Sequence, residues 1–405
     1  MPDKLYLLLS FSISFLVVLF AIPKIILVAK TKKLFDIPNQ RSANQDKVIP
    51  NLGGIAIFSG FFISAVISLE GFDVKKIVSL LLASLIMFLI GLYDDTIGLS
   101  AKKKLFSQIL VALYLAIVSN FRFTNLHGLF GINEINYISS VTLTTIAIIG
   151  LINAFNLIDG IDGLAAGIGT LISAVYGIIF LHFGQIEYAI LSFSITGSLV
   201  AFFFYNVFGK ANKIFMGDTG SLTLGVVFAV LTIWFNEIDT FKNPENQLWT
   251  LPAISLAIMI VPVVDSIRVF TIRIIHHKSP FSPDMNHIHH QLIKITNNHL
   301  HATIIMVLGN LLLIYLSLGL IDVMGNNILF IFTLTLGFLL AYIPVLINKN
   351  KIAKTDVLTI PSEQEIPHLH LIKSIHQQAT VAEIGNEDDA DSDKDQNSSQ
   401  MLHTI

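Results

Sequence analysis

Cysteine is absent from this chain of 405 residues, and charged residues are scarce. Without cysteine the protein has no disulfide, no thiolate nucleophile and no cysteine-bound zinc site. The sequence also lacks the Gly-Lys-Ser/Thr phosphate loop and a strand-anchored Gly-x-Gly-x-x-Gly string, which leaves ATP and dinucleotide binding without support. Asp, Glu, Lys and Arg make up only 13% of the residues. A carboxylate among long apolar runs therefore needs a functional reason.

Long apolar runs occupy most of the chain, of which 53% is hydrophobic. A helix of about 20 apolar residues crosses the hydrocarbon core of a bilayer. By this criterion the sequence predicts an all-α, polytopic membrane protein of about eleven transmembrane helices. Their approximate positions are 5–29, 53–69, 77–93, 105–119, 138–152, 165–183, 187–206, 220–235, 249–272, 302–320 and 327–347. The first run lacks a small-residue cleavage site and continues past Lys24, so we interpret it as a spanning helix and not as a signal peptide.

The charge of the connecting loops predicts the orientation of these helices, because Lys and Arg collect on the cytoplasmic side. Every second loop is rich in these residues: 30–52, 94–104, 206–219 and 273–301. With eleven spans, this places the N-terminus outside and the C-terminus inside. Near its end the sequence is polar and acidic and cannot bury enough apolar surface to fold alone. We therefore expect an integral membrane domain over 1–348 and a cytoplasmic tail over 349–405, largely disordered at its end.

Four short polar strings interrupt the apolar sequence, and all of them fall on the predicted cytoplasmic side. They are GLYDDTIG (91–98), NAFNLIDGIDGLAAG (153–167), IFMGDTGSL (214–222) and SPFSPDMNHIHHQL (279–292). This shared side is inferred from the Lys and Arg content of the loops and not from the motifs themselves. It therefore indicates independently that the four strings form one site. The first three strings carry five aspartates. Because Mg²⁺ is a hard ion held by one or two carboxylates and by substrate phosphates, these aspartates indicate a magnesium and phosphate site.

Asp94 and Asp95 stand where the third predicted span meets the cytoplasm. Adjacent carboxylates repel each other unless a cation or a proton offsets their charge. One interpretation is a solvated helix end beside the lysines of residues 102–104. The other is metal binding or general-base catalysis.

The second string places Asn153, Asn156, Asp159 and Asp162 at steps of three residues. Neighbours at this spacing share a helix face, although the first and the last do not. The glycines of Asp-Gly-Ile-Asp-Gly weaken a helix and let a ligand approach the backbone. We predict a broken helix end that lines a cavity, with a Gly-rich turn capped by Asn and Asp as the alternative.

In the third string, Asp218 comes just before the eighth predicted span and beside Thr219 and Ser221. Either hydroxyl can cap that helix, and helix N-termini attract phosphate. An ordinary Gly-Asp-Thr-Gly turn is the alternative. The string is similar to the Gly-x-Gly-Asp string of intramembrane aspartyl proteases, but Phe215 occupies the first Gly position, which argues against a protease.

Seven of the thirteen histidines lie between residues 276 and 301, among them His287, His289 and His290. A His-x-His-His run is one signature of zinc. Here the run follows a Pro-rich loop and has no carboxylate at a clear ligand spacing. We interpret these histidines as neutral imidazoles that hydrogen-bond substrate oxygens, with a structural role as the alternative for any one of them.

Taken together and in this order, the strings resemble those of the polyprenyl-phosphate N-acetylhexosamine-1-phosphate transferase family over roughly residues 34–292. The last string is closer to the WecA/TagO-like branch than to the related MraY branch. The resemblance implies transfer of an N-acetylhexosamine-1-phosphate, with GlcNAc-1-phosphate as the first expectation. The donor would be a UDP-sugar, the acceptor undecaprenyl or another polyprenyl phosphate, and UMP would be released. This would be the first membrane step of cell-envelope glycan synthesis, at the cytoplasmic face of a bacterial inner membrane.

The resemblance also implies roles for individual residues. Asp94 and Asp95 match the family's aspartate pair, which is associated with magnesium binding and with deprotonation of the lipid phosphate. Asn156, Asp159 and Asp162 match the next motif, which serves the metal, the catalysis and the nucleotide. We therefore expect the catalytic residues to be Asp94, Asp95, Asp159 and Asp162.

Asp218 matches the family's magnesium-ligating aspartate, and Phe215 matches an aromatic residue that stacks on uracil. The expected metal ligands are Asn156, Asp218 and Asp95. The expected substrate-binding residues are Phe215, Asn153, His287, His289, His290, Lys104 and Arg41. The cofactor would be Mg²⁺, with Mn²⁺ as a substitute. The expected partners are a UDP-N-acetylhexosamine, a polyprenyl phosphate lipid and the membrane, and not nucleic acid; a homodimer is compatible with the sequence.

Two positions depart from the family pattern. Met285 stands where Arg is frequent, and Asn44 stands where His is common. For the mechanism we favour direct attack of the lipid phosphate on the β-phosphorus, with a double displacement through an aspartyl-phosphate on Asp159 as the alternative. Two other functions remain open: the same transfer with a different UDP-amino sugar, and ion-coupled membrane transport, which also uses broken helices and intramembrane acids.

Overall fold

The computed structural model describes residues 2–32, 49–72, 74–238, 251–277 and 286–358. The chain forms two units, Met1–Asn348 and Lys349–Ile405. Of the second unit, only the helical residues up to Leu358 are described. All the elements that form the site belong to the first unit.

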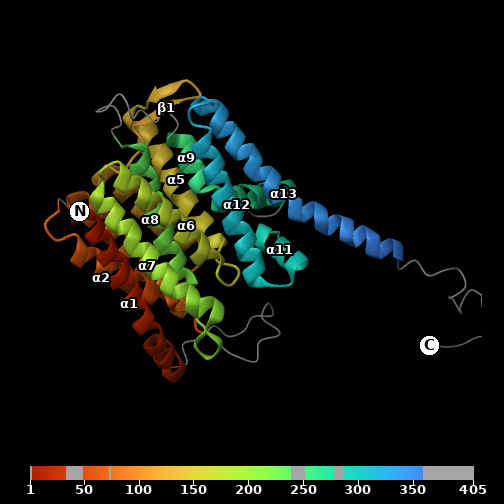
Figure 1. The fold of residues 1–405 in the computed structure, drawn as a ribbon, viewed down its shortest axis with the longest axis horizontal. Coiled ribbons are helices and arrows are strands. Elements are labelled where there is room, and N and C mark those ends of the chain that lie inside the picture. Colours follow the sequence, from red (N-terminus) through yellow and green to blue (C-terminus); the bar gives the residue numbers. More distant parts are fainter. Residues whose placement is uncertain (1, 33–48, 73, 239–250, 278–285, 359–405) are drawn as a thin grey trace, which may run out of the picture. The chain divides into compact units, whose positions relative to one another are not determined.

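The described residues form α-helices, two short irregular helices and one small hairpin (Figure 1). The α-helices are α1 (Pro2–Lys32), α2 (Gly53–Ser68), α3 (Lys75–Ile97), α4 (Ala101–Leu113), α5 (Tyr137–Leu157), α6 (Leu164–His182), α7 (Ile186–Phe208), α8 (Gly217–Asn236), α9 (Leu251–Ile258), α10 (Ile260–Ile275), α11 (Ile288–Thr296), α12 (His299–Gly319) and α13 (Asn326–Leu358). The irregular helices are η2 (Tyr114–Val118) and η3 (Lys210–Asn212). The strands β1 (Asn125–Leu129) and β2 (Ile132–Glu134) pair antiparallel, with Leu129 opposite Ile132.

Eight helices of the described chain are long and apolar enough to cross a membrane: α1, α3, α5, α6, α7, α8, α12 and α13. The pair α9 and α10 passes the same test as one span with a bend of 78°. The all-helical membrane class that the sequence predicts is therefore confirmed, with eight or nine candidate spans in the part of the chain that is described. The predicted eleven also include α2, which has 16 residues, and the stretch of α4 and η2, in which the α-helix has only 13.

The bend between α9 and α10 has a local cause. Pro262 has no backbone N–H, so the carbonyl oxygen of Ile258, four residues earlier, loses its usual helical donor. The amide of Asn310 in α12 lies 3.4 Å from this oxygen and 3.1 Å from that of Ala257. A side chain of a neighbouring helix thus satisfies the backbone at the break, as an apolar environment requires.

Helix α8 lies at the centre of the first unit and is buried along almost its whole length. It packs against α2, α3, α5 and α6, while α1 packs against α2 and α7 (Figure 1). The C-terminal end of α8 lies beside the hairpin, where Glu237 accepts a hydrogen bond from the backbone N–H of Thr124 at 2.7 Å. Its N-terminal end therefore lies at the opposite end of the bundle, where α3 and α5 end.

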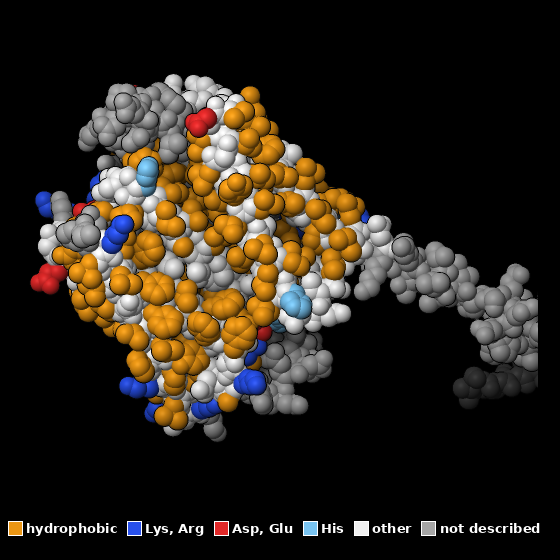
Figure 2. Space-filling model, viewed as in Figure 1, with side chains coloured by type: hydrophobic (Ala, Val, Ile, Leu, Met, Phe, Trp, Pro, Cys, Tyr) orange, Lys and Arg blue, Asp and Glu red, His pale blue; other side chains and the backbone are white. Residues whose placement is uncertain are grey.

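The surface of the bundle matches a lipid environment. Figure 2 shows hydrophobic side chains over most of the visible face, with Lys and Arg side chains gathered along the lower edge, where α1 ends. Lys30 near that end donates a hydrogen bond to the carbonyl oxygen of Ala211 in η3. Lys30 thus lies at the end of the bundle where α8 begins.

Candidate active site

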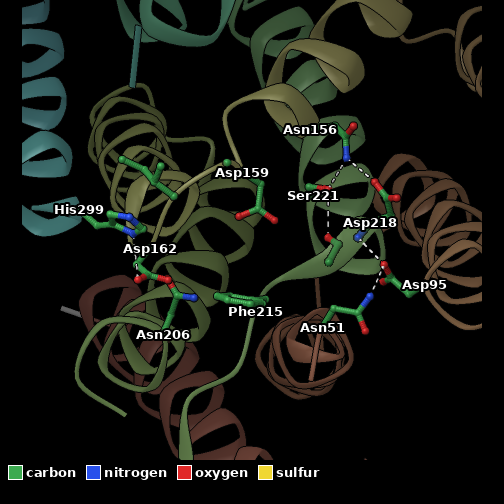
Figure 3. Close-up of a pocket in the computed structure, with 13 residues that line it drawn as sticks. Asn51, Asp95, Asn156, Asp159, Asp162, Asn206, Phe215, Asp218, Ser221 and His299 are labelled. Atoms are coloured by element: carbon green, nitrogen blue, oxygen red, sulfur yellow. Dashed lines mark hydrogen bonds and ion pairs between the residues drawn. The ribbon is translucent and has the colours of Figure 1, made fainter. Parts of the chain in front are cut away.

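A cavity of about 520 Å³ opens at the N-terminal end of α8 (Figure 3). Six residues named from the sequence line it: Asp95, Asn156, Asp159, Asp162, Phe215 and Asp218. They come from the end of α3, the end of α5 with the loop after it, the segment before α8, and the start of α8. The first three polar strings therefore meet at one place, whereas His287, His289 and His290 of the fourth string do not line the cavity.

The lining also contains Asn51 and Asn206, which no sequence pattern singles out, Ser221, which the sequence indicates only as a helix cap, and His299, one of the histidines of the 276–301 segment. Asn206 connects three segments, because its amide oxygen accepts from the N–H of Gly163 at 2.5 Å and its amide nitrogen donates to the carbonyl of Ile214 at 2.9 Å. A single Asn at the end of an apolar helix has no distinguishing pattern, and only the fold shows what it holds.

Asp95 attaches the end of α3 to the beginning of α8. Its carboxylate accepts hydrogen bonds from the backbone N–H groups of Asp218 (2.9 Å) and Thr219 (2.8 Å) and from the Thr219 hydroxyl (2.5 Å). A helix N-terminus leaves its first N–H groups without intrahelical partners, and a carboxylate there also matches the positive end of the helix dipole. Asp95 thus caps α8 from another helix.

Gly217 makes this cap possible. Its φ of +73° is a left-handed conformation that favours glycine. A Cβ atom at this position would meet the backbone oxygen of Asn51 and would lie 2.6 Å from Oδ2 of Asp95. No larger residue fits between the cap and the loop.

Asp218 is held by one cation and one amide. Its Oδ2 lies 3.0 Å from Nζ of Lys104, and its Oδ1 accepts from the Asn156 amide at 2.5 Å. The same amide lies 2.8 Å from the Ser221 hydroxyl. Lys104 also forms an ion pair with Asp94, so one ammonium group lies between two carboxylates. Burial opposes the charged form of Lys104, but the charges of Asp218 and Asp94 prevail and raise its pKa.

Asp159 points into the cavity from the loop between α5 and α6 (Figure 3). Its carboxylate has no hydrogen bond or ion pair within the described ranges. Burial, and then the negative charges of Asp218, Asp95 and Asp162, raise the pKa of Asp159 well above its usual range. The cavity thus contains an ionisable group that no positive charge of the described chain offsets.

Asp162 lies on the other side of the cavity, with two basic partners. Nζ of Lys213 lies 2.6 Å and Nδ1 of His299 lies 3.1 Å from its Oδ2. Although burial has the opposite effect, the hydrogen bonds from His299 and Lys213 lower the pKa of Asp162. Nζ of Lys213 also lies 5.6 Å from the ring centre of Phe215, which places a cation near a half-buried aromatic ring.

Five expected substrate-binding residues lie outside the cavity lining: Asn153, His287, His289, His290 and Lys104. Asn153 is paired with the amide of Gln108, with distances of 2.7 and 3.3 Å. His287 is bound to Asp265, and the rings of His289 and His290 lie 4.3 Å apart beside it. Burial lowers the pKa of His289 to about 3, so that its ring is neutral. Asp94 and Lys104 do not line the cavity themselves. Lys104 pairs with Asp94 and with Asp218, and Asp218 lines the cavity.

Three positions singled out in the sequence lie outside the described residues. They are Arg41, Asn44 and Met285. Their expected contacts therefore remain predictions.

The donor set of the cavity fits a magnesium ion. Among the residues that the structure describes, no three His, Asp or Glu side chains group closely enough to enclose a metal ion. Mg²⁺ does not need such a cage, because it usually keeps waters and binds one or two carboxylates plus substrate phosphates. Asp159 and Asp218 would supply the carboxylates, and the Asn156 oxygen would be a further hard ligand on the same cavity. The uncompensated charge at Asp159 is the observation that a bound cation would explain.

Comparisons with known proteins show the family of this chain. Residues 77–236 match the family described as glycosyl transferase family 4. The chain is 30% identical, over 315 residues, to an undecaprenyl-phosphate alpha-N-acetylglucosaminyl 1-phosphate transferase of Yersinia pestis, covering 76% of this chain and 82% of that protein. It is 31% identical, over 300 residues, to a probable undecaprenyl-phosphate N-acetylglucosaminyl 1-phosphate transferase of Bacillus subtilis, covering 74% and 80%. The corresponding enzyme of Escherichia coli K12 is 29% identical over 289 residues, covering 71% and 76%.

The chain therefore belongs to glycosyl transferase family 4, as a polyprenyl-phosphate N-acetylhexosamine-1-phosphate transferase. The family resemblance of the motifs is confirmed, and with it the class of enzyme. The protein is a multi-pass membrane transferase.

Proposed function

We propose that this enzyme transfers N-acetylglucosamine-1-phosphate from UDP-N-acetylglucosamine to undecaprenyl phosphate and releases UMP. An oxygen of the lipid phosphate attacks the β-phosphorus of the donor. A new P–O bond forms, the bond between the β-phosphorus and the oxygen of UMP breaks, and UMP leaves. The product begins a cell-envelope glycan.

One observation carries this proposal: a single polar cavity at the end of an apolar bundle is lined by Asp159, Asp218 and Phe215. Carboxylates suit a metal that binds phosphates, and an aromatic ring suits a nucleobase. The names of the relatives at about 30% identity supply the donor sugar and the lipid.

The chemistry requires positive charge. A UDP-sugar carries about two negative charges, and a phosphomonoester with a second pKa near 6 carries nearly two more at pH 7. We propose that Asp159, Asp218 and Asn156 hold Mg²⁺, with Mn²⁺ as a substitute. When bound, the metal neutralises charge on the phosphates and brings them together. Asp95 contributes by fixing the α8 N-terminus, and Lys104 by orienting Asp218.

The arrangement of the cavity also suggests where each substrate lies. Phe215 would stack on the uracil ring, with Lys213 near the same ring. Asp162 then lies on the nucleotide side, and Asp159 lies between it and the cluster of Asp218 and Asn156. The reacting phosphates would occupy this centre, where the lipid phosphate arrives from the membrane.

We propose that the cavity faces the cytoplasm. Lys30, Lys104, Lys210 and Lys213 all lie at the end of the bundle that contains the cavity. Lys and Arg near the ends of membrane helices mark the cytoplasmic side. UDP-sugars are anionic nucleotides, so a positive rim on that side would also attract the donor.

Purified protein in detergent tests the proposal directly. UMP release is measured with undecaprenyl phosphate, Mg²⁺ and a panel of UDP-amino sugars. Lipid-dependent release that is highest with UDP-N-acetylglucosamine and stops on addition of EDTA is the expected result. Faster release with another UDP-amino sugar would replace the proposed donor, and no release from folded protein with any donor would contradict the function.

A further inference from the structure

Asp265 is a buried carboxylate that the cavity does not use. It lies in α10, has 0% exposure, and does not line the cavity. Its Oδ2 accepts from Nδ1 of His287 at 2.8 Å, and a guanidinium nitrogen of Arg268 lies 3.6 Å from Oδ1. Ionisable groups inside a membrane helix are costly and are usually retained for a function.

The partners of Asp265 place it at the beginning of another helix. Oδ1 accepts from the backbone N–H of Ile288, the first residue of α11, at 2.9 Å. Asp265 thus caps α11 from α10 and orients the ring of His287, which precedes the helix. One side chain fixes both the position and the direction of the His-Ile-His-His segment.

This segment presses against the loop after α5. A Cβ atom built on Gly160 would meet Nε2 of His289 and would lie 2.9 Å from its Cε1. The imidazole ring therefore lies directly on the glycine between Asp159 and Ile161. Nδ1 of His289 is buried with no hydrogen-bond partner within the described ranges, so the ring contributes a surface and not a hydrogen bond there.

The loop has few connections of its own. After α5 ends, the N–H of Asp159 makes only a long bond of 3.3 Å to the carbonyl of Asn156. The loop is held from outside by the Thr303 hydroxyl on the Asp162 carbonyl, by the Asn206 amide on Gly163, and by Lys213 and His299 on the Asp162 carboxylate. His289 contacts Gly160, the residue next to Asp159.

We propose that Asp265 is a positioning residue that acts through the N-terminus of α11. It holds the ring of His289 against Gly160 and so fixes the loop that carries Asp159 and Asp162. The inference rests on the proposed function only for its catalytic consequence, because the packing relationship can be tested without turnover.

The first test replaces the carboxylate. Asp265→Asn keeps an acceptor for the Ile288 N–H but loses the acceptor for His287, and Asp265→Ala loses both. Turnover should fall about 10- to 100-fold in Asp265→Asn, the loss typical of removing an outer-shell residue that orients a ligating side chain, with little change in the KM for the UDP-sugar. Ser266→Ala is the matched control, because this neighbouring hydroxyl is buried without a partner within the described chain and should be replaceable. Wild-type turnover in Asp265→Asn would overturn the proposal.

The second test is a double-mutant cycle between Gly160 and His289, which remains informative if the Asp265 variants fail to fold. Gly160→Ala places a methyl group where the imidazole lies and should lower both turnover and the thermal unfolding midpoint in detergent. In the His289→Ala background the same methyl group meets no ring, so its cost in turnover should be about tenfold smaller, and its cost in midpoint should largely disappear. Equal costs in both backgrounds would overturn the proposal. The midpoint cycle does not depend on transferase activity, so absence of UMP release in the wild type would contradict the proposed function alone.

Discussion

Asp95 in α3 and Thr219 in α8 are joined by two hydrogen bonds, from the backbone N–H at 2.8 Å and from the hydroxyl at 2.5 Å, both to Oδ2. The other carboxylate oxygen of Asp95, Oδ1, accepts hydrogen bonds from the backbone N–H of Asp218 and from the side-chain amide of Asn51. The carboxylate that the sequence assigns to the metal is therefore occupied with holding a helix end. Asp159 and Asp218, which line the same cavity, are the carboxylates that we propose for the ion.

Replacing Asp95 should affect stability as well as activity. Asp95→Ala removes the cap of α8, and losing an N-cap costs about 1–2 kcal/mol. The thermal unfolding midpoint of the detergent-solubilised protein should fall, and UMP release should fall with it. The matched control is Asp159→Ala, which removes an aspartate of the same cavity that accepts no hydrogen bond within the described residues. Equal thermal unfolding midpoints for Asp95→Ala and Asp159→Ala would contradict the role of Asp95 as the N-cap of α8.

Replacing Asp159 should separate stability from activity. Because the pKa of Asp159 is raised, its charged form is less favourable in the folded protein than in the unfolded chain, and it costs stability at neutral pH. Asp159→Asn removes that charge, so the unfolding midpoint measured in EDTA should rise while turnover is lost. Such a gain is typical of a residue that is retained for chemistry. A lower midpoint together with normal turnover would show that Asp159 is structural.

Magnesium dependence should identify Asp218 as a ligand. Asp218→Asn keeps the size of the side chain but removes a negative charge from the metal site and from the pair with Lys104. At ordinary Mg²⁺ concentrations turnover should be abolished, and any activity that returns should do so only at a higher Mg²⁺ concentration. Titration of UMP release with Mg²⁺ measures both, with Ser107→Ala as a control on the exposed side of α4. Near-normal activity with an unchanged Mg²⁺ requirement would exclude the assignment.

The sequence predicts the membrane class and the meeting of three motifs because both leave regular patterns. Apolar runs of spanning length fix the helices, and aspartates in an apolar chain indicate a site. The three-residue spacing of Asn153, Asn156 and Asp159 does not predict which of these side chains reach the cavity. Asn156 and Asp159 reach the cavity, whereas Asn153 turns to Gln108 on α4, because its partner is set by how α4 packs against α5.

The histidines illustrate the same limit in another way. His287 and His289 stand out by their spacing, whereas His299, which lines the cavity, lies outside that run. Asp265 is the buried partner of His287, and it lies 22 residues earlier in the chain. No local pattern connects these positions, because the contact exists only once α10 and α11 are packed.

Phe215 should govern affinity for the donor more than turnover. Its ring lines the cavity, and its backbone is fixed on both sides: its N–H donates to the carbonyl of Pro50, and its carbonyl accepts from the N–H of Gly53. Stacking of a base on an aromatic ring contributes about 1–3 kcal/mol, so Phe215→Leu should raise the KM for the UDP-sugar about tenfold or more. Because the uracil lies away from the reacting phosphorus, its contact is equal in the ground and transition states, and kcat should change little. Phe215→Tyr keeps the ring and should keep a KM close to that of the wild type. Steady-state UMP release with varied UDP-sugar distinguishes these outcomes, and a loss confined to kcat would place the uracil elsewhere.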